Sequence, residues 1–420
     1  MNTYNDKFVI VGGAELNGEA TIQTSKNAVL PILAGSILCD KPVIVNNVPN
    51  ILDVQNMFGI LSDLGVNINN VENNCYIDAS NMSGVTLNQD LCKSLRSSIF
   101  LLGPLLARFK KAIISYPGGC DIGNRPIDLH LSGLEKLGVK ILKQHSLIYC
   151  DGRSMKSGTV QLDFPSVGAT ENLMMSAIFL KGCTRLINVA KEPEIVDLQN
   201  FLNSMGADIS GAGTAEITIN GVNQLHSTQY TPINDRIVEG TLMLATAICG
   251  GKVKLNNTNF KNNQSLIAKL SSVGCQIDIK DDIINITSKG RLPSVDLIDT
   301  QVYPGFPTDM QAQMMSLQAV SDGVSIICEN VFENRFKHAK ELIKMGANII
   351  LRDRVAVVKG VSELTGAPVD ATDLRAGAGL VLAGLKAKGY TTVNNVYHID
   401  RGYECLEKTL KELGADIKRL

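Results

Sequence analysis

The hydrophobic positions of this chain follow a pattern that recurs about every 70 residues, one sixth of its 420 residues. In each copy, a glycine follows a hydrophobic residue and precedes a small or hydrophobic residue, a variable residue and an isoleucine. The glycines are Gly65, Gly138, Gly206, Gly274, Gly346 and Gly414. Six copies of one structural unit therefore fill the chain.

Each repeated glycine lies between a helical pattern and a strand pattern. Before Gly206, residues 198–205 place apolar side chains three or four positions apart, as on one face of a helix. After it, residues 207–210 alternate between apolar and polar. The pattern predicts an amphipathic helix that ends at a glycine cap and is followed by a strand.

A second, more apolar helix precedes the amphipathic helix in every copy, and a short strand rich in Val or Ile follows it. The predicted buried helices cover residues 27–39, 97–109, 172–180, 240–249, 310–320 and 374–385. Each unit is therefore predicted as strand-helix-strand-helix-strand, with one buried and one amphipathic helix.

The length of the unit favours two compact α/β lobes over a solenoid. Solenoid repeats typically run about 20 to 50 residues, whereas a unit of about 70 residues has room for its own sheet. Pro232 interrupts the pattern between the third and fourth units, so the chain is predicted to cross between lobes there. We expect residues 26–233 in one lobe and residues 1–25 plus 234–420 in the other, with a strand at residues 8–11 completing the second lobe.

Composition and charge exclude several classes of function. The chain is 45% hydrophobic and 19% charged, and 40 Lys and Arg oppose 41 Asp and Glu, a net charge of -1. The global basic field of a nucleic-acid binder is missing, so an anionic substrate must be bound by local charges. The longest apolar stretch, residues 28–39, contains Pro31 and is shorter than the ~20 residues of a membrane span. Residues 1–11 lack the apolar segment of a secretory signal, so we expect a cytoplasmic protein.

The ten cysteines are scattered and form no Cys-x-x-Cys pair, which argues against zinc and redox-pair chemistry. Most are interpreted as small buried hydrophobes, and Cys75 and Cys150 as chemically inert.

Cys120 differs from the other cysteines because of the loop that contains it. Residues 115–130 hold three glycines and two prolines, and such a backbone suits a mobile loop that approaches a ligand closely. An exposed thiol near Arg125 can act as a nucleophile or a general acid. His130, at the end of the segment, is either a supporting partner or a structural hydrogen bonder.

Cations stand at the predicted starts of three buried helices. They are Lys26, Arg96 and Arg375. A cation at a helix start interacts unfavourably with the helix dipole, by about 0.3 to 1 kcal/mol, so we expect a compensating anion nearby. Serine and threonine at such positions are interpreted as ordinary caps. Three cations from separate units predict that these helix starts converge on an anionic ligand.

Asp and Arg gather beside Gly and aromatic residues in later loops, at residues 306–309, 332–335, 371–375 and 397–404. This density exceeds what turns require, although salt-bridged loop ends would also explain it, above all for Asp373 with Arg375. The sequence contains no Gly-x4-Gly-Lys-Ser/Thr motif and no dinucleotide fingerprint, so ATP-driven and NAD-dependent chemistry have no support.

Seven motifs, in chain order, match those of one enzyme family. They are Ser25-Lys-Asn-Ala28, Pro117-Gly-Gly-Cys120 with Arg125-Pro-Ile-Asp-Leu-His130, Ser166-Val-Gly-Ala-Thr170, Phe306-Pro-Thr-Asp309, Phe332-Glu-Asn-Arg335, Asp373-Leu-Arg375 and His398-Ile-Asp-Arg401. Over its whole length the chain resembles the UDP-N-acetylglucosamine 1-carboxyvinyltransferase family. The resemblance implies a two-lobed inside-out α/β barrel, the enolpyruvyl transferase fold, with three units in each lobe and the active site in the cleft between them.

The resemblance also implies an activity. The enolpyruvyl group of phosphoenolpyruvate would pass to the 3-hydroxyl of UDP-N-acetylglucosamine with release of phosphate, the first committed step of peptidoglycan synthesis. These two substrates are the implied partners, and no metal, organic cofactor, nucleic acid or membrane insertion is implied. Sensitivity of Cys120 to the epoxide fosfomycin is implied as well, whereas the oligomeric state stays open.

By position, the resemblance assigns catalytic roles to Cys120, Asp309 and Lys26. Cys120 would protonate the methylene carbon and could form a phospholactoyl thioether adduct, and Asp309 would take the proton of the attacking hydroxyl. The residues implied to hold phosphoenolpyruvate are Lys26, Asn27, Arg125 and Arg401. Those implied near the nucleotide sugar are Asn27, Arg96, Arg125, Pro126, Ile127, Asp128, Leu129, Ser166, Val167, Gly168, Asp309 and Val331. The implied supporting residues are His130, Arg335, Asp373 and Arg375.

One residue departs from the family pattern, and two rival functions are less consistent with the motifs. Phe164 stands where some members carry a lysine, so it would stack or pack near the nucleotide instead of contacting a phosphate. The nearest rival, the shikimate-pathway enolpyruvyl transferase, lacks the Pro-Gly-Gly-Cys segment. A catalytically silent paralogue is the rival of another class, and the presence of both Cys120 and Asp309 argues against it.

Overall fold

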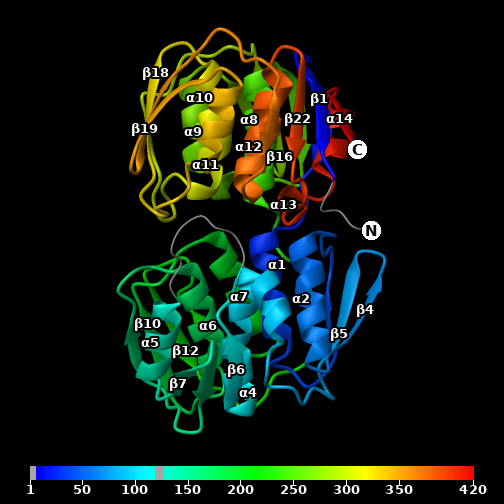
Figure 1. The fold of residues 1–420 in the computed structure, drawn as a ribbon. Coiled ribbons are helices and arrows are strands. Elements are labelled where there is room, and N and C mark those ends of the chain that lie inside the picture. The colour runs from blue at the N-terminus through cyan, green and yellow to red at the C-terminus, as the bar shows by residue number, and fades with distance from the viewer. Residues whose placement is uncertain (1–5, 119–126) are drawn as a thin grey trace. The chain divides into compact units, whose positions relative to one another are not determined.

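The computed structural model describes residues 6–118 and 127–420, which form two compact units, each around its own hydrophobic core (Figure 1). The N-terminal unit contains residues 24–118 and 127–233, and the C-terminal unit contains residues 6–23 and 234–420. None of the helices in these ranges combines the length and apolar character required to span a bilayer.

The N-terminal unit contains three small sheets and the helices of three repeats. Its helices are α1 (Lys26–Ser36), α2 (Leu52–Asp63), α3 (Gln89–Ser94), the 3-10 helix η2 (Arg96–Leu101), α4 (Leu102–Phe109), α5 (Asp128–Lys136), α6 (Val167–Ala177) and α7 (Pro193–Ser204). Its strands are β3 (Val43–Val45), β4 (Asn67–Val71), β5 (Asn74–Asp78), β6 (Lys111–Ser115), β7 (Lys140–Gln144), β8 (Leu147–Asp151), β9 (Thr159–Gln161), β10 (Cys183–Ile187), β11 (Asp208–Ser210), β12 (Glu216–Asn220) and β13 (Gln229–Tyr230). The strand orders are β13-β3-β5-β4, β6-β8-β7 and β11-β12-β10-β9.

The C-terminal unit repeats this plan. Its helices are α8 (Arg236–Cys249), η3 (Phe260–Asn262), α9 (Gln264–Ser272), η4 (Thr308–Met310), α10 (Gln311–Val320), α11 (Lys337–Lys344), α12 (Leu374–Lys386), α13 (Tyr397–Asp400) and α14 (Leu406–Glu412). Its strands are β1 (Phe8–Val11), β2 (Leu16–Thr21), β14 (Gly251–Asn256), β15 (Gln276–Lys280), β16 (Ile283–Ser288), β17 (Leu297–Asp299), β18 (Val324–Cys328), β19 (Asn348–Arg352), β20 (Val355–Lys359), β21 (Pro368–Asp370), β22 (Tyr390–Asn394) and β23 (Asp416–Arg419). The strand orders are β15-β16-β14-β2, β17-β18-β20-β19 and β21-β22-β1-β23.

The repeated glycines end the amphipathic helices, as predicted. Each lies just after α2, α5, α7, α9, α11 or α14, and all six have a φ between +88° and +105°. A side chain would be strained in this conformation, so glycine is the residue that lets the chain turn from helix to strand. The structure adds one strand to the predicted unit, because most repeats continue into a hairpin such as β4–β5 or β11–β12.

The first strand completes the C-terminal unit, as the sequence indicated. Strand β1 lies between β22 and β23 and is antiparallel to both, with Phe8 opposite Val393 and Arg419. Strand β2 pairs in parallel with β14 of the same unit, although α1, the next helix along the chain, belongs to the N-terminal unit. Strand β13, which precedes α8 in the chain, pairs with β3 of the N-terminal unit.

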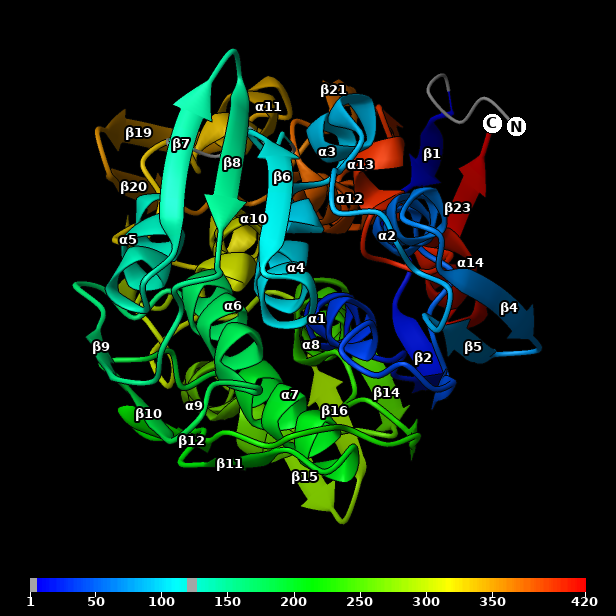
Figure 2. The ribbon, with the colours of Figure 1, turned by 90° about the horizontal axis from the view of Figure 1, so that it is seen from below.

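Glycines allow the buried helices to pack closely in the interior of each unit. In the C-terminal unit α8, α10 and α12 contact one another, and a Cβ on Gly379 of α12 would lie 2.9 Å from the Ala312 carbonyl oxygen. In the N-terminal unit, Gly103 of α4 meets Asn172 of α6, whose Oδ1 accepts the Gly103 N–H at 2.7 Å. Figure 2 shows α1, α4 and α6 in the interior of the N-terminal unit, with its strands around them. This packing brings the starts of the buried helices together within each unit.

Candidate active site

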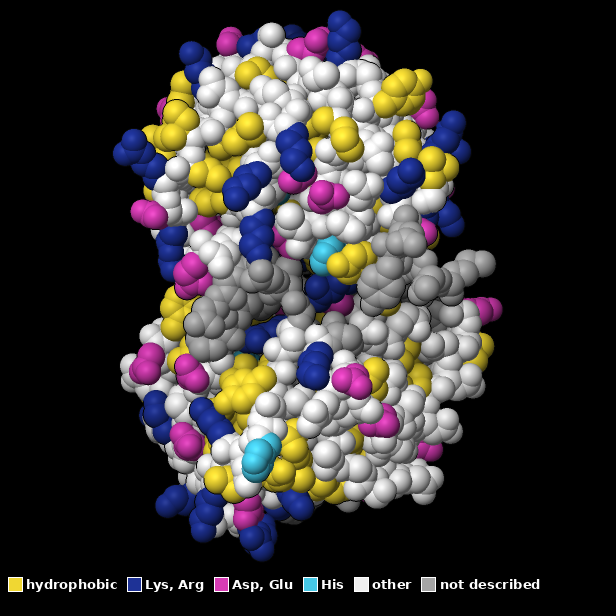
Figure 3. All heavy atoms as spheres, viewed as in Figure 1, with side chains coloured by type: hydrophobic (Ala, Val, Ile, Leu, Met, Phe, Trp, Pro, Cys, Tyr) yellow, Lys and Arg dark blue, Asp and Glu magenta, His cyan; other side chains and the backbone are white. Residues whose placement is uncertain are grey.

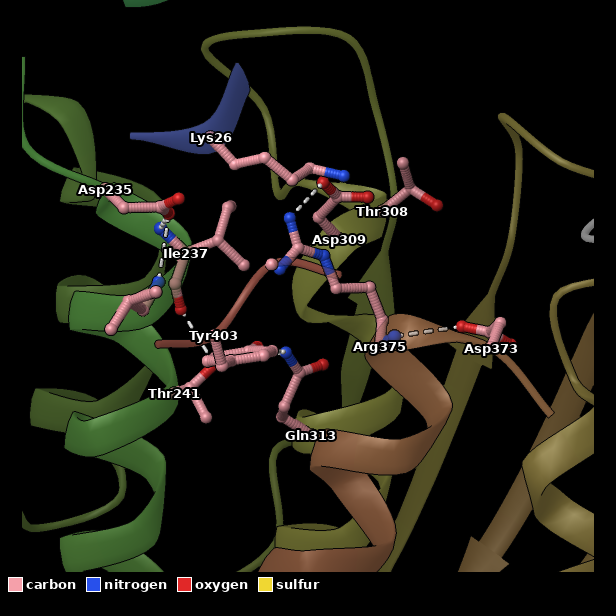
Figure 4. Close-up of polar contacts among 12 residues, drawn as sticks. Lys26, Asp235, Ile237, Thr241, Thr308, Asp309, Gln313, Asp373, Arg375 and Tyr403 are labelled. Carbon is pink, nitrogen blue, oxygen red and sulfur yellow. Dashed lines mark hydrogen bonds and ion pairs between the residues drawn. The ribbon is translucent and has the colours of Figure 1, made fainter. Parts of the chain in front are cut away.

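Asp309 is the centre of a charged cluster in the C-terminal unit (Figure 4). Helix η4 presents it just before α10, and its Oδ1 accepts a hydrogen bond from Arg335 Nη2 at 2.6 Å. Its Oδ2 accepts a hydrogen bond from Arg375 Nη2 at 3.1 Å. The side chain of Asp309 is 27% exposed, whereas those of the two arginines are 5% and 4% exposed. A carboxylate between two buried guanidinium groups is held ionised and fixed in direction.

Arg375 is held by groups at the start of α12. Asp373 caps this helix and accepts hydrogen bonds from the backbone N–H groups of Arg375 and Ala376. Burial strongly disfavours the charged guanidinium, but the charges of Asp309, Tyr403 and Asp235 and the hydrogen bond to Tyr403 together outweigh burial, and the pKa of Arg375 is raised. Arg375 therefore stays a cation in the interior, and the predicted charge of this helix start is retained.

A buried polar network lies beneath Arg375 and connects helices α8 and α10. The guanidinium carbon of Arg375 lies 5.7 Å from the ring centre of Tyr403, and the Tyr403 hydroxyl is 2.9 Å from Thr241 Oγ1 of α8. Gln313 of α10 donates to both oxygen atoms, at 3.2 and 3.3 Å. Because the groups come from separate repeats, the network fixes the helix starts relative to one another.

Glu329, just after β18, organises the segment that contains Val331. Its carboxylate accepts hydrogen bonds from Thr300, from Thr308 and from the backbone N–H groups of Val331 and Phe332, at 2.9 to 3.1 Å. Thr308 in turn accepts a hydrogen bond from Arg335 Nη1 at 3.0 Å. The Val331 segment and the Asp309 cluster are thus parts of one hydrogen-bonded assembly.

Arg401 follows helix α13, which is held by the last strand. Asp400, the residue before it, forms a two-pronged ion pair with Arg419 of β23, and Arg419 also contacts Glu407 at 3.1 Å. Burial, together with the charge of Arg401, lowers the pKa of His398. Arg401 therefore extends from a short helix with a charged anchor at its end.

Lys26 is the first residue of α1 in the N-terminal unit, as predicted. Its Nζ lies 3.1 Å from Asp53 Oδ2, and the two side chains are 13% and 2% exposed. Ser25, at the cap position, makes no side-chain hydrogen bond to the helix start, and no acidic residue lies in the first turn. The backbone N–H groups at this start therefore have no anionic cap, and Asn27 is the next residue.

Arg96 begins η2, and its Nη1 makes a long contact of 3.5 Å with the Pro117 carbonyl oxygen. At Gly118 the backbone N–H donates to the Cys92 carbonyl, and any Cβ there would collide with the Lys93 carbonyl oxygen. These contacts fix the beginning of the Cys120 segment. Cys120, Arg125 and Pro126 themselves lie outside the described residues.

The contacts of His130 favour its interpretation as a structural hydrogen bonder. Of the residues before it, Ile127 is buried, whereas Asp128, the first residue of α5, is exposed. His130 is 7% exposed, and its Nδ1 lies 2.8 Å from Asn172 Nδ2. Because Asn172 Oδ1 accepts the Gly103 N–H, its Nδ2 is the donor, so His130 Nδ1 accepts. This ring joins α5 to α6, with Leu129 beside it only half-buried.

Ser166, Val167 and Gly168 form the start of α6. The Ser166 hydroxyl accepts a hydrogen bond from the Ala169 N–H at 3.4 Å, and a Cβ at Gly168 would lie 3.0 Å from the His130 ring. Phe164, just before this start, is 46% exposed. An aromatic side chain so exposed is available to a planar ligand.

Three supporting residues were not predicted from the sequence: Asp53, Glu329 and Arg419. Asp53 lies in the first turn of α2, where an acid is ordinarily interpreted as a partner of the helix dipole. Glu329 follows a strand and Arg419 lies in the last one, where charges are common. Each finds its partner only through tertiary contacts.

The comparisons with known proteins all find similarity to carboxyvinyltransferases. A sequence model of EPSP synthase (3-phosphoshikimate 1-carboxyvinyltransferase) matches residues 10–410. The chain is 49% identical to UDP-N-acetylglucosamine 1-carboxyvinyltransferase 2 of Caldanaerobacter subterraneus subsp. tengcongensis, over 99% of each chain. It is 47% identical to UDP-N-acetylglucosamine 1-carboxyvinyltransferase 1 of Clostridium perfringens, over 99% of this chain and 100% of the relative.

Solved structures show the same fold. The enolpyruvyl transferase NikO from Streptomyces tendae superposes with a TM-score of 0.88 at 25% identity, over 99% of each chain. EPSP synthase from Acinetobacter baumannii superposes with a TM-score of 0.76 at 15% identity, over 99% of this chain and 100% of that one. The predicted two-lobed enolpyruvyl transferase fold is confirmed.

Proposed function

The chain belongs to the UDP-N-acetylglucosamine 1-carboxyvinyltransferase family, and we propose how its own residues carry out the family's reaction. The reaction transfers the enolpyruvyl group of phosphoenolpyruvate to the 3-hydroxyl of UDP-N-acetylglucosamine, releases phosphate and begins peptidoglycan synthesis. The observation that carries the assignment of roles is the Asp309 carboxylate, which is held by two buried arginines at a helix start.

Asp309 is the base for the attacking hydroxyl. Arg335 and Arg375 each donate to a different oxygen of the carboxylate, so its remaining lone pairs have a fixed direction. Its partial exposure leaves room for a substrate hydroxyl, and the guanidinium groups of Arg335 and Arg375 keep it ionised. Asp373 supports the cluster by capping the helix that carries Arg375. Asp309 therefore also counts among the contacts of the nucleotide sugar.

Phosphoenolpyruvate is held by Lys26, Asn27, Arg125 and Arg401. Lys26 stands at a helix start without an anionic cap, which suits a phosphate or carboxylate group. Asp53 keeps the ammonium group directed and is itself almost fully buried. Arg125 and Arg401 come from the sequence motifs, with Arg401 anchored through Asp400 and Arg419.

The nucleotide sugar is assigned to helix starts and to one strand end of the chain. The residues are Asn27, Arg96, Arg125, Pro126, Ile127, Asp128, Leu129, Ser166, Val167, Gly168 and Val331. The α6 start, with its neutral serine cap, leaves the helix dipole available to a diphosphate. His130 acts as a positioning residue under this start, because its ring packs against Gly168.

Proton transfers balance between Asp309 and Cys120. The sugar oxygen bonds to C2 of phosphoenolpyruvate while Asp309 takes the hydroxyl proton and Cys120 gives a proton to the C3 methylene. In the second step the bond between C2 and the phosphate oxygen breaks and phosphate leaves with the Asp309 proton. C3 then returns a proton to Cys120, and the vinyl group is restored.

The organisation of the chain follows from these roles. The lobe expected from the sequence at residues 26–233 begins two residues earlier in the structure, at Thr24, and the other lobe holds residues 6–23 and 234–420. The reaction takes Lys26, Cys120 and Arg125 from the first lobe and Asp309 and Arg401 from the second. The activity is placed in the cytoplasm.

Acceptor choice tests the proposal. Phosphate release from phosphoenolpyruvate should require UDP-N-acetylglucosamine, and shikimate 3-phosphate should not replace it. Cys120→Ser should lose turnover, because a hydroxyl of far higher pKa is a poor proton donor, whereas Cys120→Asp should retain it. Turnover of Cys120→Ser at the wild-type rate, or release driven by shikimate 3-phosphate, contradicts the assignment.

A further inference from the structure

On the outward face of the sheet β17-β18-β20-β19, one row of side chains is apolar across all four strands, while the row on one side of it holds Val324, Lys359 and Asn348. The register aligns Leu297, Ile326, Val357 and Ile350 in one row that crosses all four strands. Leu297, Ile326 and Ile350 are 52%, 42% and 57% exposed. Figure 3 shows hydrophobic side chains on the side of the C-terminal unit where Figure 1 places β18 and β19.

The neighbouring row carries opposite charges at its two ends. It runs from Asp299 on β17 through Cys328 and Val355 to Arg352 on β19. Asp299 accepts hydrogen bonds from the neutral amides of Gln301 and Asn330, and it also interacts electrostatically with Lys269 of α9. Arg352 is exposed and has no ion-pair partner among residues 6–118 and 127–420. The face is thus acidic along one edge strand and basic along the other.

The fold does not require an apolar face here. The sheet β15-β16-β14-β2 occupies the same place in another repeat, and its outward positions on β14 and β2 include Lys252, Lys254, Asn17 and Glu19. Outward positions on antiparallel sheets are ordinarily polar when they face water. Contiguous apolar patches on monomers are commonly interaction sites.

We propose that this face binds the same face of a second copy of the chain. A two-fold axis that runs parallel to the strands and passes between β18 and β20 places β17 of one copy over β19 of the other. Leu297 then meets Ile350 of the second copy, and Ile326 meets Val357. Asp299 meets Arg352, so both charged edges are paired at the same time. Two twisted sheets pack in this aligned way at a separation of about 10 Å.

The size of the face sets the expected strength. Four strands about 4.8 Å apart give an apolar area of a few hundred Å², less than the roughly 800 Å² per partner of a standard stable interface. The pair is therefore expected to be a weak, reversible dimer and not a permanent one.

Sedimentation velocity of the full chain between about 1 and 200 μM tests the apolar row. The wild type should shift from monomer to dimer, and Ile326→Thr with Ile350→Thr should remain monomeric, since threonine keeps the strand propensity and removes the apolar contact. Tyr390→Thr is the matched control, because Tyr390 is 71% exposed on another sheet, and it should dimerise like the wild type. A wild type that stays monomeric at every concentration overturns the proposal.

Charge reversal tests the pairing geometry independently of the apolar row. Asp299→Lys and Arg352→Asp should each weaken the dimer at least tenfold, because like charges then oppose each other. The double variant should regain association, since the two-fold axis restores both pairs. Single variants that dimerise like the wild type, or a double variant weaker than both, overturn the two-fold arrangement.

Discussion

The two units share one fold, but the starts of their buried helices differ in charge. In the C-terminal unit α8 and α12 begin at Asp235 and Asp373, whose side chains accept two backbone N–H groups each, and η4 carries Asp309. In the N-terminal unit α1 and η2 begin at Lys26 and Arg96 without a side-chain cap. There, α6 has the neutral cap Ser166.

The difference teaches how one repeat serves two chemical tasks. In the C-terminal unit, aspartate caps offset the positive ends of α8 and α12, and Asp309 is an ordered carboxylate, which suits its proposed role as base. Uncapped or neutral starts keep their positive ends, so the N-terminal unit suits anions. The partners of acidic side chains also differ between the two units. Two arginines keep Asp309 ionised, whereas Glu171 of α6 is 1% exposed and its carboxyl oxygens have no hydrogen-bond partner among the described residues.

The largest effect is expected from Asp309→Asn. The amide preserves the shape but takes no proton, so kcat should fall by about 10² to 10⁴. Phosphate release measures turnover, and calorimetric titration with UDP-N-acetylglucosamine shows whether binding survives. Asp322→Asn, which removes an exposed carboxylate that pairs with Arg291, is the control and should turn over normally. A kcat within threefold of the wild type would remove Asp309 from the role of base.

Lys26→Met should raise the KM for phosphoenolpyruvate by about 10 to 100-fold, because a charge-assisted hydrogen bond contributes roughly 1.5 to 3 kcal/mol. The single variant also removes the ammonium group that faces the buried Asp53 carboxylate, so its stability should fall. Adding Asp53→Asn should recover the stability but not the KM.

A recovered KM in that double variant would mean that Lys26 serves only its ion pair. The matched control is Lys254→Met, which breaks an exposed pair with Glu19 and should change neither quantity.

Ser166→Asp gives α6 an aspartate cap like those of α8 and α12 in the C-terminal unit. An anionic cap neutralises the helix end, so the affinity for UDP-N-acetylglucosamine should fall by about fivefold, the equivalent of roughly 1 kcal/mol. Thermal stability should hold or rise slightly. Ser166→Thr keeps a neutral cap and should bind normally. Tighter binding by the aspartate variant would contradict the contrast between the units.

Glu171→Gln tests, through the free energy of unfolding, whether the buried Glu171 is protonated while Asp309 is ionised. Burial raises the pKa of Glu171 well above its ordinary value, and Glu194 and Glu192 add to the shift. The unfolded chain then releases this proton at lower pH than the native one, so stability is lost as pH rises above about 4.5, with a limiting slope of about 1.4 kcal/mol per pH unit. The advantage of the glutamine variant should therefore grow with pH in urea titrations.

Glu216→Gln is the control for this titration. Its exposed carboxyl bonds to Arg185, which lowers the pKa of Glu216, so the removal should have the opposite sign and a small size. An advantage of Glu171→Gln that does not change with pH would show that Glu171 is ionised in the native state.

The sequence predicted whatever depends on local pattern. The glycine period located all six repeats, and the helical spacing located the buried helices that begin at Lys26 and Leu374. The motif residues Asp309, Arg335 and Arg375 do meet. The partners of β2 and β13 were not predictable, because β2 contains Gly18 and polar residues and alternates poorly. Asp53, 27 positions from Lys26, was missed for a related reason: side-chain pairing across the fold has no local signal.

The position of β1 between β22 and β23 determines the order in which the chain can be completed during synthesis. Strands β1 and β2 are made first, but the strand that pairs with β2 begins at Gly251 and those that pair with β1 come later still. At about 5 to 20 residues per second, the ribosome needs on the order of 10 to 80 s to reach them. Residues 24–118 and 127–233 belong to a unit with its own core, which we expect to fold in that interval, while residues 6–23 still lack their partner strands. The C-terminal unit is therefore the last to form, and it closes only when the newest strand meets the oldest.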